Sequence, residues 1–452
     1  MKKGSITKLA SLILALSMVL SLFGCASSNQ QQATSSGNTA STQAAEPTAN
    51  SSISSGDTEK SDNNGPAVEI EALGWKSEAT EGFKELSNTF NAQNPGIKLT
   101  FTTSPDFYQT LQGRIAAGNP PDLMGVWSGN YHRELIKGGN LIEITSQPFL
   151  GNIRENVLEF QKMDGKIWSM PIDMAAIGFI YNKDVFAKVD AEVPKTWDEF
   201  KAVCEKIKAT GVTPVLYCGQ DAWTLNQAFL SLSAPLVYGA DPQFDLNAVT
   251  GSKKYTDSAW EKGINYFTEV KDTYANKDVM SLNYSTGNQM IAEGKAAMVM
   301  QGIWCVSSIK EYNPNANLGF FTPPLGDKPF MILGADFTLG VSSKSKHQAE
   351  ALKVLEFMST KQASDIWTSK VKTLSCVKDS AMDFDNVVKD VKAIADAGAQ
   401  IYPIPNHMWF SLSVDTDVPA MLQEVNAGKL SSKDALKRLD QLIRTAYKDY
   451  MR

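Results

Sequence analysis

The folded part of the chain opens with apolar and polar residues in alternation. Residues 68–73 alternate at the period of a β-strand, and a glycine follows directly. Residues 78–90 carry apolar side chains at helical spacing, and Asn94-Pro95-Gly96 then breaks the pattern. Residues 97–102 alternate again. The order strand, helix, strand predicts an α/β layer with a parallel sheet.

The same alternation of elements returns further along the chain. Residues 197–209 place Phe200, Val203, Cys204 and Ile207 on one helical face, and a strand is predicted over 212–217. Residues 432–447 predict a helix near the C-terminus, capped by Ser431 or Ser432. No internal repeat and no second membrane-spanning pattern is found.

Length and composition set the scale of the fold. The 452 residues are too many for one ordinary domain and suit two large lobes. Hydrophobic residues make up 43%, enough to build cores. The formal net charge of −6, with no basic run, argues against a nucleic-acid partner.

The first residues predict secretion. Lys2, Lys3 and Lys8 precede an apolar run over residues 9–23 that is short for a membrane span and typical of a signal peptide, assigned to residues 1–24. The run ends in Leu22-Phe23-Gly24-Cys25, which resembles a bacterial lipobox, so we expect a lipid on Cys25. The alternatives are an uncleaved anchor or a plain secretory peptide.

A tether is predicted after the signal peptide. Residues 25–66 consist mainly of Ser, Thr, Asn, Gln, Ala and Gly, with Ile53 as the one large aliphatic residue. Such a composition cannot bury enough apolar surface to offset the entropy of ordering.

Motifs for catalysis or metal binding are missing from the sequence. No nucleophile elbow, zinc-protease helix, P-loop or dinucleotide fingerprint occurs, and we expect no cofactor and no metal. The remaining cysteines have no metal-ligand spacing, and buried thiols are preferred over disulfides although both stay open: Cys204, Cys218, Cys305 and Cys376. Acidic residues are plentiful, so a glycosidase carboxylate pair also stays open.

Four segments carry a resemblance to a known family. They are residues 115–123, residues 165–171 together with 179–186, residues 194–200 with the sequence Pro-Lys-Thr-Trp-Asp-Glu-Phe, and residues 294–304 ending in Trp304. In the third, Thr196 and Glu199 have the spacing of a capping box. In order and spacing these segments resemble the bacterial extracellular solute-binding proteins, the family that includes maltose-binding protein.

The resemblance implies an α/β fold of two lobes, of the periplasmic-binding-protein kind, with hinge crossovers and a ligand cleft between the lobes. We expect the chain to cross near residues 172–174, 322–325 and 357–360. The predicted lobes are residues 67–173 plus 325–358 at the N-terminal side and residues 174–324 plus 359–452 at the C-terminal side.

Ligand residues are expected where strands of an open α/β sheet end. Aromatic rings stack on the C–H faces of a sugar, while carboxylates bond its hydroxyls. The predicted binding residues are Trp75, Trp127, Asp173, Asp221, Trp223, Trp304, Asp336 and Trp409. Four other tryptophans lie inside predicted elements and are expected to pack: Trp168, Trp197, Trp260 and Trp367.

The sequence thus predicts a binding protein without enzymatic activity. It would hold a carbohydrate, with an oligosaccharide favoured by the several aromatic residues, and pass it to the permease of an ABC importer. We expect a monomer, anchored by lipid on the outer face of the cell membrane. The alternatives are a non-sugar solute, such as a polyamine, glycerol phosphate or iron, and a secreted glycoside hydrolase.

Overall fold

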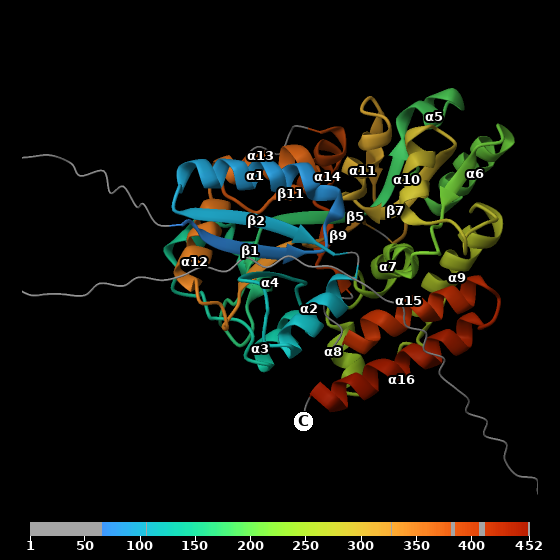
Figure 1. Ribbon diagram of the computed structural model, residues 1–452. Helices are drawn as coiled ribbons and strands as arrows, with labels where there is room; N and C mark the ends of the chain where they lie inside the picture. The colour runs from blue at the N-terminus through green and yellow to red at the C-terminus, as the bar shows by residue number, and fades with distance from the viewer. Residues whose placement is uncertain (1–65, 105, 327, 381–384, 406–411, 451–452) are drawn as a thin grey trace, which may run out of the picture. The chain divides into compact units, whose positions relative to one another are not determined.

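Two mixed β-sheets organise the part of the chain that the computed structural model describes, residues 66–104, 106–326, 328–380, 385–405 and 412–450 (Figure 1). The first sheet has five strands in the order β2-β1-β3-β10-β4. Its strands are β1 (Val68–Gly74), β2 (Ile97–Thr103), β3 (Leu123–Val126), β4 (Met170–Pro171) and β10 (Thr338–Val341). β1 pairs in parallel with β2 and β3, as the strand–helix–strand pattern predicts, whereas β10 is antiparallel to β3 and β4.

The first sheet is covered by helices from both early and late parts of the sequence. Figure 1 shows α1 lying along β1 and β2. Side chains from α1, α12 and α13 share one buried cluster with this sheet, and those of α2 and α3 share a smaller one. The short and long helices here are η1 (Ser77–Ala79), α1 (Thr80–Gln93), α2 (Phe107–Ala116), α3 (Asn130–Lys137), η2 (Pro148–Asn152), α4 (Glu155–Gln161), α12 (Gln348–Met358) and α13 (Lys361–Val371).

The second sheet has seven strands and is built around one long strand, β5. Its path is β12-β9-β5-β7-β6, and β8 and β11 also pair with β5. The strands are β5 (Asp173–Asn182), β6 (Thr213–Leu216), β7 (Ala296–Gly302), β8 (Leu318–Phe321), β9 (Phe330–Ala335), β11 (Leu374–Ser375) and β12 (Gln400–Tyr402).

Both faces of the second sheet are buried under helices. Along β5, Ile177 and Phe179 enter one buried cluster, and Ala176 and Ile180 enter another, because successive side chains point to opposite faces. The surrounding helices are α5 (Lys183–Lys188), α6 (Trp197–Ala209), α7 (Ala222–Val237), α8 (Phe244–Val249), α9 (Ser258–Thr273), α10 (Tyr284–Ala292), α11 (Cys305–Tyr312), α14 (Asn386–Asp396), α15 (Leu412–Asn426) and α16 (Ser432–Tyr450).

The helix caps predicted from the sequence form the expected hydrogen bonds. The hydroxyl of Thr196 accepts a hydrogen bond from the backbone N–H of Glu199 at 3.2 Å, which confirms the cap of α6. The carboxylate of Glu199 reaches back to the N–H of Lys195 at 2.7 Å, one residue before the usual capping-box position. Ser431 caps α16 by accepting from the N–H of Asp434. The cysteines at 204, 218, 305 and 376 are free and buried, as preferred.

The chain crosses between the two sheets at places that differ in part from the prediction. The first crossing, between β4 and β5 at Ile172, lies where we expected it. The second lies between β9 and β10, at residues 336–337, because β9 pairs with β5 and stays in the second sheet. The predicted crossing at 322–325 is therefore wrong.

The third predicted crossing, at 357–360, is also wrong. Both α12 and α13 pack in the cluster of the first sheet, and Trp367 and Val371 of α13 are fully buried there. Cys376 and Val377 join the same cluster, whereas α14 packs on the second sheet. Packing with the first sheet thus extends to Val377, well beyond the predicted crossing, although the short strand β11 before it pairs with β5.

Asp173 forms hydrogen bonds with several segments near these crossings. Its backbone carbonyl accepts from the N–H of Asp336 at 3.1 Å, and its Oδ1 accepts from the N–H of Phe337 at 2.8 Å. Its Oδ2 accepts from Trp367 Nε1 and from the hydroxyl of Thr373, both at 2.8 Å. The residue is fully buried, so these bonds replace the water that the carboxylate would otherwise hold.

None of the helices within the described ranges combines the length and apolar character that a membrane crossing requires.

The substitution Asp173→Ala tests this role. It leaves three buried donors without an acceptor, and we expect a loss of about 3–5 kcal/mol in the free energy of unfolding. Denaturant unfolding measures this loss. The control is Asp396→Ala, because that side chain is 64% exposed and pairs with Lys392 across one helical turn. The control should unfold close to wild type, and equal stability of the two variants would contradict the role of Asp173.

Candidate functional site

Two of the predicted binding residues lie together at the carboxyl ends of β1 and β3. These strands pair in parallel, so Trp75 after β1 and Trp127 after β3 emerge side by side. Their ring centroids are 4.9 Å apart, and both side chains are half-buried. A Cβ atom at Gly125 would come within 2.9 Å of the Trp75 ring, so the glycine lets the indole lie against β3.

A second aromatic group lies at the carboxyl ends of β6 and β7. Trp304 follows β7, and Trp223 lies in the first turn of α7 after β6. The centroids of these two rings are 6.5 Å apart, and Tyr284 lies 5.0 Å from Trp223. Trp223 is 39% exposed, which is unusual for a residue of its size and leaves its ring available for contact.

Gly302 decides where the indole of Trp304 lies. A Cβ atom at this glycine would stand 2.0 Å from the ring, far closer than non-bonded atoms can approach. The indole therefore folds back over the end of β7, where only a residue without a side chain leaves room. In the sequence Gly302-Ile303-Trp304, the glycine that leaves this room stands two residues before the tryptophan.

Lys76 connects the two aromatic groups. It follows Trp75 at the end of β1 in the first sheet, yet its ammonium lies 6.0 Å from the centroid of the Trp304 ring beyond the second sheet. The side chain of Lys76 is 1% exposed. The carboxyl ends of strands in both sheets therefore meet here, where open α/β sheets bind ligands.

The Lys76 ammonium is held by carboxylates from several segments. Its Nζ lies 2.5 Å from Asp336 Oδ2, 3.7 Å from Glu78 Oε1 and 3.9 Å from Asp173 Oδ2. Burial alone would lower the pKa of Lys76, but the neighbouring carboxylates, Asp336 first among them, raise it above its ordinary value. Burial raises the pKa of Asp336 to about 7, although the Lys76 charge acts in the opposite direction.

The predicted acidic residues therefore have partners inside the protein. Both carboxylate oxygens of Asp173 accept the hydrogen bonds described above. The Oδ2 atom of Asp221 accepts from the backbone N–H of Tyr284 at 2.7 Å, and so positions the start of α10. Asp336 lies at the centre of the site, paired with Lys76. Trp409, also predicted, lies outside the described residues.

The structure adds residues that the prediction left out. Lys76 directly follows Trp75 in the sequence, and this position is the signal that could have placed it in the site. Glu78 lies two residues further, in η1. Tyr284 begins a helix after Asn283, whose side chain caps it, and nothing in the local sequence marks it as facing Trp223.

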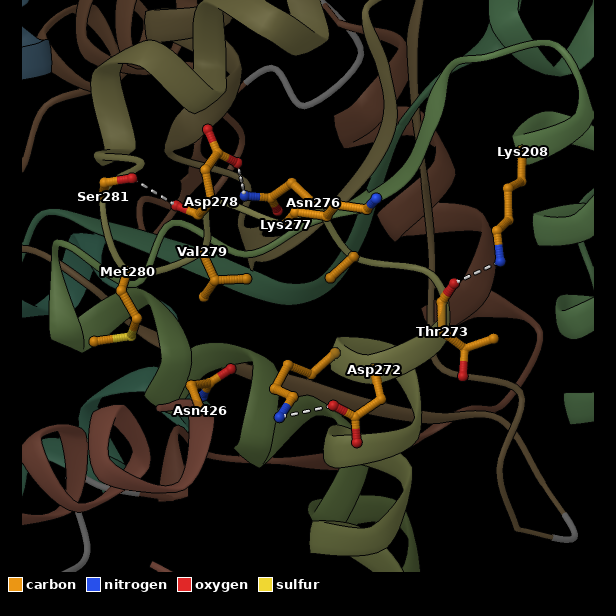
Figure 2. A pocket seen from close by; sticks show the side chains of 12 residues that line it. Lys208, Asp272, Thr273, Asn276, Lys277, Asp278, Val279, Met280, Ser281 and Asn426 are labelled. Carbon is orange, nitrogen blue, oxygen red and sulfur yellow. Dashed lines mark hydrogen bonds and ion pairs between the residues drawn. The ribbon is translucent and has the colours of Figure 1, made fainter. Parts of the chain in front are cut away.

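A separate surface pocket of about 610 Å³ lies between the end of α9, the segment that leads to α10, and Asn426 of α15 (Figure 2). Its side chains largely satisfy one another: Lys271 pairs with Asp272, and Asn276 donates to Asp278 at 2.8 Å. None of its lining residues is aromatic and none was predicted for binding. It therefore lacks the flat apolar surfaces of the site around Trp304.

Comparison with known proteins agrees with this architecture. Residues 74–365 match the sequence model of the bacterial extracellular solute-binding proteins. The multiple sugar-binding protein of Streptococcus mutans is 28% identical over 316 residues, covering 66% of this chain and 72% of that protein. A binding protein of Brucella abortus is 30% identical over 315 residues, covering 67% and 74%. The melibiose/raffinose/stachyose-binding protein MelE of Bacillus subtilis is 25% identical over 383 residues, covering 79% and 84%.

Solved structures show the same two-lobe fold. A chitin oligosaccharide binding protein superposes with a TM-score of 0.75 at 20% identity, covering 85% of this chain and all of that one. The binding protein RafE in complex with raffinose superposes with a TM-score of 0.71 at 22% identity, covering 84% and 100%. The matched family consists of binding proteins rather than enzymes, which confirms the prediction that the chain is not an enzyme. The chain belongs to the family of bacterial extracellular solute-binding proteins.

Proposed function

We propose that this chain binds an oligosaccharide between its two lobes and delivers it to the permease of an ABC importer. The observation that carries the proposal is the meeting of aromatic side chains from two sheets around Lys76. Trp75 and Trp127 stand at the first sheet, and Trp223 and Trp304 at the second. Indole rings match the C–H faces of pyranose sugars, and a ligand held by both groups would span more than one sugar unit.

Polar groups suited to sugar hydroxyls lie beside the rings. The carboxyl group of Asp336, the ammonium of Lys76 and the carboxylate of Glu78 form one connected group next to Trp304. Such charged groups form stronger hydrogen bonds with hydroxyls than neutral ones do. Their positions are fixed by burial, which lowers the entropy cost of binding.

The relatives support a sugar as the ligand. The names of the compared proteins include multiple sugars, melibiose, raffinose and stachyose, and one compared structure holds raffinose. These ligands are those of the relatives, and their shared chemistry is that of neutral oligosaccharides. Because members of the family bind different sugars, the identity of the sugar depends on the shape of each protein's cleft.

We assign the first lobe to the five-stranded sheet and its helices, and the second lobe to the seven-stranded sheet without β11, because Cys376 and Val377 beside this short strand pack with the first sheet. In residues these are 67–171 with 338–377, and 173–335 with 386–450. The crossings at Ile172 and at 336–337 would act as hinges. Lys76 and Trp304 would then approach or separate as the lobes move.

A thermal-shift screen tests the proposed function. The panel contains neutral oligosaccharides of two to five units, a polyamine, glycerol phosphate and ferric citrate. We expect an oligosaccharide to stabilise the protein by about 2.7 kcal/mol at one hundred times its dissociation constant. The bound oligosaccharide should be recovered uncleaved. Stabilisation by one of the other solutes alone, or cleavage of the sugar, would overturn the proposal.

Substitution of the second aromatic group tests the site itself. Trp223→Ala should weaken binding of the sugar found by the screen about thirtyfold, as loss of a central aromatic anchor does. Its stability should change little, because the indole is 39% exposed. Trp304→Ala should weaken binding by a similar factor, with a larger loss of stability because Trp304 also packs on the core.

The matched control is Trp260→Ala. Trp260 is fully buried in the core of the second lobe, so its truncation should cost about 3–5 kcal/mol of stability. Titration calorimetry on the folded fraction should show wild-type affinity for this control. Wild-type affinity of Trp223→Ala and Trp304→Ala would remove these residues from the site.

We also propose that the mature chain is a lipoprotein, held to the outer face of the membrane through Cys25 and the tether of residues 25–66. The lipobox-like residues 22–25 support this, and they precede the described residues. Cys25→Ser should release a binding-competent protein into the medium, measured by immunoblot of membrane and medium fractions. Retention of the variant in the membrane fraction would exclude a lipid on Cys25 as the anchor.

A further inference from the structure

The candidate site holds more negative than positive charge. Around the single ammonium of Lys76 stand three carboxyl groups, at 2.5 Å for Asp336, 3.7 Å for Glu78 and 3.9 Å for Asp173. Lys76 is 1% exposed and Asp173 is fully buried, so water screens this group poorly. One positive charge cannot neutralise three carboxylates. Burial, and to a smaller extent the charge of Asp173, raise the pKa of Asp336.

A fourth carboxylate approaches from the other lobe. Glu311 lies on α11, which packs against η1, the short helix that carries Glu78. Burial and then the charge of Glu78 raise the pKa of Glu311. The negative charge therefore lies on both sides of the place where the lobes meet.

Nearby basic groups are already engaged. Lys310, also on α11, pairs with Asp385, and the ammonium of Lys76 is taken by Asp336. The positive charge of each is therefore already balanced by a carboxylate. A bound carboxylate or phosphate would meet the charges of Glu78 and Glu311, and the repulsion costs most at Glu78, where water screens the charge least.

We propose that, given the sugar-binding function above, the site accepts neutral and amino sugars, rejects sugars bearing a carboxylate or phosphate, and uses Glu78 to set this preference. The exclusion arises from repulsion rather than from a missing contact, which is a common way for binding sites to discriminate. Glu78 is the decisive residue because its side chain, 15% exposed, shares the Lys76 ammonium and faces the second lobe.

Matched sugars of different charge test this inference. Calorimetry would compare maltotriose, cellobiose and galactotriose with their uronate forms, and cellobiose with the glucosamine dimer, at low ionic strength. Within any set that binds, we expect the neutral or amino sugar to bind wild type at least about tenfold more tightly than the uronate. Glu78→Gln should reduce this ratio several-fold.

The controls separate charge from general damage. Glu81→Gln removes a charge whose side chain is 75% exposed on α1, and it should leave the ratio unchanged. Glu311→Gln serves as the second test variant in case Glu78→Gln fails to fold, because Glu311 lies at an exposed position. This variant should also reduce the ratio. A ratio unaltered in both variants would overturn the assignment to these glutamates.

The outcomes also distinguish this inference from the function beneath it. A uronate that binds wild type as tightly as its neutral partner would overturn the charge preference and leave sugar binding intact. No stabilisation by any sugar, charged or neutral, in these sets or in the thermal-shift panel would overturn the proposed function, and the inference with it.

Discussion

The buried ion group of Lys76, Asp336 and Asp173 constrains the rest of the structure. A charged group without water is costly unless partners surround it, so each of these side chains requires the others in place. The three residues are far apart in sequence: Lys76 follows β1, Asp173 begins β5, and Asp336 lies between β9 and β10. The group therefore forms only when the first sheet and two crossings have assembled. The group lies beside the aromatic residues of the proposed binding site.

The aromatic residues depend on this frame. Trp75 precedes Lys76 directly, so the placement of the lysine also places the indole beside Trp127. On the other side, Gly302 leaves the space in which Trp304 folds toward the same ammonium. Rings held in this way need little further ordering to meet a ligand. We propose that the negative surplus around them restricts which ligands are tolerated.

Local structure could be predicted from the sequence, whereas long-range partners could not. The alternation at 68–73 and the cap at Thr196 are determined by neighbouring residues, and both elements form as expected. The positions of Trp75, Trp127 and Trp304 after strands could also be predicted, because parallel strands end at one edge of a sheet, and their contact with a ligand stays a prediction. By contrast, Asp173 meets Trp367 and Thr373 across almost two hundred residues, and no local pattern announces such a partner. We predicted that Asp173 contacts the ligand, and in the structure its carboxylate accepts hydrogen bonds from Phe337, Trp367 and Thr373.

The misplaced crossings have a similar cause. Pro323-Pro324 is a strong break in the sequence, but it separates two strands of the same sheet, β8 and β9. The passage at residues 336–337 contains no proline, and its backbone is held by hydrogen bonds to Asp173. We propose that the two lobes close about these crossings when a sugar binds. Small-angle scattering of the folded body, with and without a saturating sugar, measures this motion. We expect a smaller radius of gyration with sugar bound, whereas an unchanged radius would show that the lobes do not close.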